Sequence, residues 1–151
     1  MKKTLLFAVF TVIAFVDVIA QSYEYKVITS VESIVPMGLG RSRIISSDEN
    51  RDYKEFTSLR TEQNNKQNKS KRAEAKIDQF EETKLVNFYS VAGINFKNIA
   101  SNDALISSKI NTMISEGWDL AFVTSGVESD AGKGDGKGIF ITRFIFKRPR
   151  Q

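Results

Sequence analysis

The stretch that decides the fold runs from Ser101 to Leu120: Ser-Asn-Asp-Ala-Leu-Ile-Ser-Ser-Lys-Ile-Asn-Thr-Met-Ile-Ser-Glu-Gly-Trp-Asp-Leu. Four apolar residues recur in it at helical spacing: Ile106, Ile110, Met113 and Ile114. This stripe predicts a helix over Asp103–Glu116 that packs one side onto a sheet, with its first turn capped by side-chain oxygens of residues 101–103. Gly117 suits the left-handed position just past a helix end. Trp118 can then fold back onto Met113 or Ile114 where a strand begins.

Several stretches around this helix have the patterns of strands. Residues 23–31 alternate, with Tyr25 and Val27 on one face and Lys26 and Ile28 on the other, which predicts a half-buried strand. Residues 118–127 alternate as well, and residues 84–90 contain a valine and two aromatic side chains, which are common in strands. Residues 139–146 are apolar on both faces, which favours a central strand. The sequence therefore predicts an α+β fold: a small antiparallel sheet of about four strands with one main helix packed on a face.

The middle of the chain has a different composition. Arg60 to Arg72 is almost wholly polar, and such a run cannot bury enough surface to order itself. We therefore expect a mobile segment around residues 60–72. After it, Ala73, Ile77 and Phe80 keep helical spacing, which predicts a short helix over residues 73–82.

The first residues have the order of a secretory signal peptide. Lys2 and Lys3 precede an apolar run from Leu5 to Val16, and Ala20 supplies a small residue before the expected cleavage site. A membrane-spanning helix needs about 20 apolar residues, so this shorter run predicts a cleaved segment over residues 1–20 and no membrane anchor afterwards. We expect residues 21–151 to form a single domain outside the cytoplasm, periplasmic or secreted.

Composition excludes several classes of chemistry. The 151 residues contain no cysteine and no histidine, which removes histidine-based nucleophile pairs, disulfides and the usual zinc and copper sites. We expect no catalytic residues of these kinds, no metal and no cofactor. The net charge of +4, from 22 basic and 18 acidic residues, is mild. It predicts no nucleic-acid partner.

One loop has the composition of an anion site. In Gly38-Leu-Gly-Arg-Ser-Arg43, Gly38 and Gly40 allow successive backbone N–H groups to converge, and Arg41 and Arg43 can add charged donors to a carboxylate or phosphate. The same residues also fit a plain glycine turn whose arginines pair with acidic neighbours. A dinucleotide fingerprint is excluded because the required third glycine and a following helix pattern are missing.

Three pieces of the chain together resemble a known family. They are Tyr25-Lys-Val27, the junction Asn111 to Leu120 with its Gly-Trp-Asp-Leu ending, and Phe146-Lys-Arg148. This pattern is similar to that of the small bacterial domain of unknown function catalogued as family 4177, of which this chain would be an elaborated exported relative. Ile110 and Asp119 stand where that pattern favours Leu and Glu, and the middle section, Ile34 to Ser101, is an addition. The resemblance implies a compact α+β fold and no particular activity.

These observations favour an exported, non-catalytic interaction or ligand-binding domain. Its expected partner is another exported protein or an anionic small ligand. The alternative function is a small carboxylate-dependent hydrolase, which needs two carboxylates facing each other across a substrate. An exposed apolar patch or an open sheet edge would favour the binding module, and convergent carboxylates with shifted pKa values would favour the enzyme.

Overall fold

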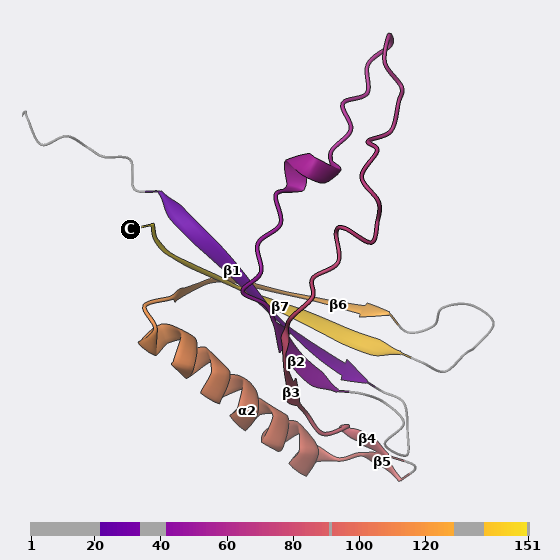
Figure 1. The fold of residues 1–151 in the computed structure, drawn as a ribbon. Coiled ribbons are helices and arrows are strands. Elements are labelled where there is room, and N and C mark those ends of the chain that lie inside the picture. Colours follow the sequence, from indigo (N-terminus) through magenta and orange to yellow (C-terminus); the bar gives the residue numbers. More distant parts are fainter. Residues whose placement is uncertain (1–21, 34–41, 91, 129–137, 151) are drawn as a thin grey trace, which may run out of the picture.

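The computed structural model describes residues 22–33, 42–90, 92–128 and 138–150. The expected signal peptide, residues 1–20, lies outside them. Five antiparallel strands form the main sheet in the order β3-β2-β1-β7-β6, and the long helix α2 lies along one face of it (Figure 1). The strands are β1 (Tyr23–Ser33), β2 (Arg43–Ser46), β3 (Glu81–Lys84), β6 (Asp119–Glu128) and β7 (Ile139–Pro149). The α+β prediction is confirmed, with one strand more than expected.

Helix α2 (Phe96–Ser115) begins seven residues before the predicted start. Asn95 is its cap and accepts hydrogen bonds from the amides of Lys97 and Asn98. The expected caps at residues 101–103 are wrong, because those residues lie inside the helix. Just before it, β4 (Tyr89–Ser90) and β5 (Gly93–Ile94) form a two-stranded ribbon.

The end of α2 follows the prediction closely. Gly117 has φ of +84°, and its amide donates to the carbonyl of Ile114. The amide of Trp118 donates to the carbonyl of Met113 at 3.0 Å. Together these two bonds form the Schellman motif that ends many helices. Trp118 is thereby turned back towards Met113, and only 7% of its surface is exposed.

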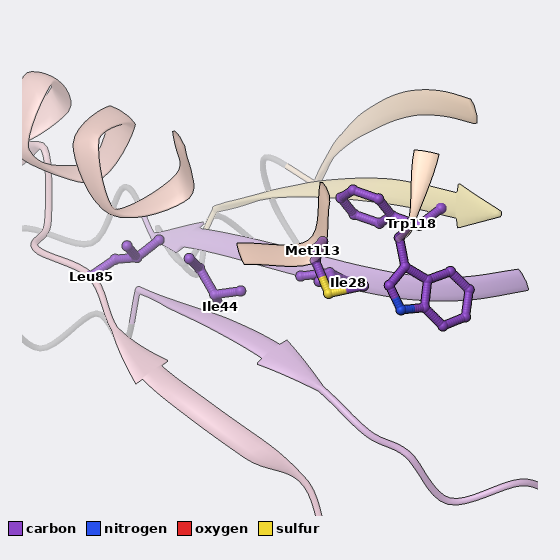
Figure 2. Packing of buried hydrophobic residues seen from close by; sticks show 6 residues of the cluster. Ile28, Ile44, Leu85, Met113 and Trp118 are labelled. Atoms are coloured by element: carbon purple, nitrogen blue, oxygen red, sulfur yellow. The ribbon is translucent and has the colours of Figure 1, made fainter. Parts of the chain in front are cut away.

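The core lies between α2 and one face of the sheet. Six buried apolar side chains form it, and they come from the helix, from three strands and from the segments between them (Figure 2). They are Ile28, Ile44, Leu85, Met113, Trp118 and Phe146. Ile106 and Ile110 pack against this cluster as predicted, whereas Ile114 points away and is mostly exposed.

Strand β1 turns its less aromatic side to the helix. Ile28 and Ser30 are buried beneath α2, while Tyr25 and Val27, on the opposite side of the strand, are exposed. The central position of β7 between β1 and β6 is confirmed. Its second apolar face, which carries Ile141 and Ile145, therefore lies beside the exposed side of β1.

Strand β6 does not keep the predicted alternation. Leu120 is opposite Phe146 and Phe122 is opposite Ile145, so the ladder is irregular at Ala121. This extra residue is a β-bulge, which rotates the chain. Phe122 consequently faces the open side of the sheet, away from Leu120, with 61% of its surface exposed.

The middle section forms no helix over residues 73–82. The predicted strand over 84–90 is formed only at its two ends, by Lys84 in β3 and by Tyr89–Ser90 in β4. Strand β3 pairs with β2 through residues 81–84. The glutamates at its start bind across the sheet and to the helix, Glu82 to Arg43 and Glu81 to Lys109, and these pairings favour the extended conformation. Residues 47–80 leave the sheet between β2 and β3 and project from it as a long excursion, the arm, which carries the short helix η1 (Tyr53–Phe56) (Figure 1).

Candidate functional site

The face of the sheet opposite α2 is open and largely apolar near its centre. In the β1–β7 ladder, Val27 is opposite Ile145 and Thr29 is opposite Arg143. Phe122 of β6 is the other neighbour of Ile145. Residues opposite each other in an antiparallel ladder project from the same face. These side chains therefore form one continuous surface across three strands.

A groove of about 330 Å³ lies on this face where the arm leaves the sheet. Its floor comes from β1 and β2, and its wall comes from the last residues of the arm. The lining consists of Val27, Thr29, Ile45, Ser46, Ser47, Ile77 and Phe80. Phe80 is 55% exposed and Val27 is 45% exposed. Large apolar side chains gathered at one hollow are typical of a binding surface.

Polar contacts at the base of the arm hold this wall in place. The Glu49 carboxylate accepts from the amide of Asp78 at 3.0 Å and from the amide of Gln79. The Ser47 hydroxyl donates to the carbonyl of Gln79 at 2.9 Å. Arg51 binds Glu49 at 2.8 Å. The chain that enters the arm is thus bonded to the chain that leaves it.

One end of the groove carries a positive charge. Arg143 is exposed and lies opposite Thr29, which lines the groove. Neither Arg143 nor the Thr29 hydroxyl is paired with a side chain of the described residues. Across the strands, their Cβ atoms lie within roughly 5 Å of each other. An apolar floor therefore meets a free guanidinium and a free hydroxyl.

A second hollow beside the arm is acidic, and its carboxylates are engaged. It has a volume of about 400 Å³ and contains Asp48, Glu49 and Glu81. A hydrogen bond from Lys26 lowers the pKa of Asp48, and a hydrogen bond from Lys109 lowers the pKa of Glu81. Asp48 and Glu81 therefore stay ionised at neutral pH. A general acid needs a raised pKa instead.

In the part of the chain that the structure describes, no three acidic residues are arranged to hold a metal ion. Nor does this part contain a helix with the length and apolar character needed to cross a membrane.

The predicted anion loop falls mostly outside the described residues. Gly38, Gly40 and Arg41 belong to the undescribed stretch 34–41. Arg43 stands at the start of β2, and its guanidinium binds Glu82 on the neighbouring strand. That contact matches the alternative interpretation, in which the arginines pair with acidic neighbours. The anion loop itself stays a prediction.

The groove was not among the sites predicted from sequence. Its parts were visible separately: Val27 and Thr29 share a strand face, Ile77 and Phe80 share a spacing, and Arg143 shares a face with Ile145. Their convergence depends on the path of the arm. Neither alternation nor spacing reveals that path.

Comparison of the chain with protein families, with curated proteins and with solved structures gives no match. The resemblance to family 4177 therefore stays a prediction.

Proposed function

We propose that this is an exported, non-catalytic domain that binds an anionic amphiphile on the open face of its sheet. The apolar chain of the ligand lies in the groove formed by Val27, Ile45 and Phe80. Its anionic head binds Arg143 and the Thr29 hydroxyl. The observation that carries the proposal is the position of Thr29, which lines the apolar groove and stands opposite Arg143.

The two ends of the ligand contribute differently to the binding free energy. Apolar contact is worth about 25 cal/mol for each Å² removed from water, so the chain supplies most of the affinity. An exposed arginine is screened by salt and adds less, although a charge-assisted hydrogen bond to it is stronger than a neutral one. The head therefore supplies selectivity. The groove volume is within the range of small-ligand sites, about 300–1,000 Å³.

Export is part of the proposal. It is supported by the order of charge, apolar run and small residue in Met1–Ala20. The alternative function, a carboxylate-dependent hydrolase, has no observation in its favour among the described residues. The acidic side chains of the hollow beside the groove are ion-paired, and the pKa shifts of Asp48 and Glu81 are downward.

Calorimetric titration with decanoate, below its micelle concentration, tests the proposal. We expect saturable binding by the exported protein and weaker binding of decanol, which has the same chain without the charge. Phe80→Ser should abolish binding of both ligands. Arg143→Gln should weaken binding of decanoate and leave decanol unchanged.

Two arm residues provide matched controls for these variants. Leu59 and Arg72 are exposed and do not line the groove, so Leu59→Ser and Arg72→Gln should bind decanoate like the wild type. Absence of saturable binding by the wild type contradicts the proposal. Binding that survives Phe80→Ser contradicts the groove as the site.

A further inference from the structure

A third hollow lies on the helix side of the sheet, over β1, β7 and β6. The groove proposed above to bind an amphiphile, called the amphiphile groove below, lies on the opposite face. It has a volume of about 270 Å³. One carboxylate, two hydroxyls and three apolar side chains line it: Glu32, Ser125, Thr142, Phe88, Ile99 and Phe140. The register places Glu32 opposite Phe140, and Ser125 opposite Thr142. Three strands, the helix and the segment before β4 thus meet around one carboxylate.

The Glu32 carboxylate is held by an asparagine that is itself fixed. The side-chain amide of Asn102 donates to Glu32 Oε1 at 2.8 Å. Asn102 is 1% exposed. Its side chain also donates to the carbonyl of Val86 at 2.8 Å and accepts from the amide of Val86 at 2.9 Å. The carboxylate is therefore oriented before any ligand arrives.

Glu32 has no counter-charge among the described residues. Several other acidic side chains of the sheet are paired, for example Glu24 with Arg148 and Glu82 with Arg43. Glu32 forms no such ion pair with any residue that the structure describes. A partly buried carboxylate gains more from a cation than a fully exposed one does, because water screens their attraction less.

The rest of the hollow suits a cation on an apolar stem. The rings of Phe88 and Phe140 lie 5.9 Å apart, tilted by 54°, and aromatic faces attract cations. The hydroxyls of Ser125 and Thr142 lie 2.8 Å from each other. Because each hydroxyl oxygen has two lone pairs, the pair can accept a further hydrogen bond.

We propose that this hollow binds the primary ammonium group of an organic amine, independently of the amphiphile groove. The ammonium donates to the Glu32 carboxylate and to the hydroxyl pair, and its alkyl stem lies against the two phenylalanine rings. A guanidinium fits less well. Its planar fork binds most strongly when both carboxylate oxygens accept side by side, and Asn102 already occupies one lone pair of Glu32 Oε1. A metal ion would find a single charged ligand here.

Two-dimensional NMR titration of the exported protein tests this. Butylamine hydrochloride at neutral pH should give saturable shifts at the amides of Glu32, Phe88 and Thr142. Butanol and butyrate, of equal length without the positive charge, should not. Shifts with butanol equal to those with butylamine overturn the proposal without any variant.

Glu32→Gln removes the charge and keeps an acceptor for Asn102. We expect butylamine to bind this variant about tenfold more weakly or worse, as loss of a charged hydrogen bond implies. Asp103→Asn changes an exposed carboxylate of α2, next to Asn102, and should bind like the wild type. Unchanged binding by Glu32→Gln overturns the assignment.

The source of the ammonium is distinguished by a second probe, Nα-acetyl-lysine amide. Binding of butylamine alone assigns the hollow to a free amine. Binding of the lysine derivative alone assigns it to a lysine side chain of a partner. Either result retains the proposed ammonium chemistry, and binding of neither overturns it.

Discussion

The guanidinium carbon of Arg148 lies 4.2 Å from the centroid of the Trp118 ring. Arg148 also binds Glu24 of β1. The last residues of β7 therefore cover the tryptophan that ends the helix-to-strand turn, and they are bound to the first strand. A cation over an indole face is stabilising, more so where water is excluded. The Gly-Trp junction and the basic end of the chain thus form one structural unit.

Truncation of Trp118 should be costly. Trp118→Ala removes a buried indole from the core and leaves a cavity, so we expect the free energy of unfolding to fall by about 3–5 kcal/mol. Urea denaturation measures this. Phe96→Ala is the control, because Phe96 is also a large aromatic but is exposed. A loss for Trp118→Ala no greater than that for Phe96→Ala would contradict the packing described.

Asn102 should be more important for stability than its position in a helix suggests. Asn102→Ala leaves the amide and the carbonyl of Val86 without their side-chain partner, and loss of each of these partly buried hydrogen bonds costs about 1 kcal/mol. Asn111→Ala, on an exposed position of the same helix, should have little effect. Thermal unfolding of the two variants provides the comparison. Equal melting temperatures would show that water replaces the asparagine.

The ion pair of Glu81 and Lys109 should make stability depend on pH in the acid range. The pKa of Glu81 is lowered in the folded protein, so its contribution is complete above the ordinary glutamate pKa of about 4.3. It is lost as the pH falls through the lowered value. Lys109→Met should therefore reduce the difference in melting temperature between pH 7 and pH 3. The effect is small because Glu81 is largely exposed. A difference in melting temperature that is larger in Lys109→Met than in the wild type would contradict the proposed linkage between Glu81 ionisation and stability.

Strand β6 should promote self-association. It is an edge strand, and all its residues from 119 to 127 are exposed. A long apolar edge pairs readily with other chains, and lysine at an edge opposes this. We expect sedimentation velocity to show a concentration-dependent mass that Val123→Lys abolishes. Leu105→Lys, at a similarly exposed apolar position on α2, should not. A wild type that is monomeric at all concentrations would contradict the expectation.

Trypsin should cut the arm first. The stretch Arg60 to Arg72 is mostly exposed, and its hydrogen bonds stay within the arm, for example from Asn68 to the carbonyls of Glu55 and Thr57. Mass spectrometry of the first fragments should place the cuts there. First cuts in β1 or α2 instead would mean that the arm is protected.

The fold could be predicted where one residue type determines local geometry. Gly117 and the apolar stripe of α2 located the helix end, and the two apolar faces of β7 located the central strand. The start of α2 could not be predicted, because Asn95 and Asn102 are the same residue type. Asn95 caps the helix, whereas Asn102 is buried inside it because its side chain bonds to the backbone of Val86, 16 residues earlier in the chain. The bulge at Ala121 left no trace in the alternation of residues 118–127.

The candidate sites were less predictable than the fold. The groove needs the arm to return beside Val27, and the ammonium hollow needs Glu32 to be free of the cations that pair with other acids. Both depend on which charges meet across long sequence distances. Glu82, for example, is bound by Arg43, and that contact could not be derived from spacing.

The two strand residues that flank the arm, Ser46 and Glu81, are partners in the β2–β3 ladder, so their backbones lie about 5 Å apart. A tight turn could join the same two strands. The entropic cost of closing a loop rises only slowly with its length. Evolution can therefore lengthen, shorten or exchange this insertion with little loss of stability of the sheet. Ile77 and Phe80 belong to the insertion, and Val27 and Thr29 belong to the scaffold. Ligand preference in such a protein can therefore diverge by replacement of one segment while the framework is inherited unchanged.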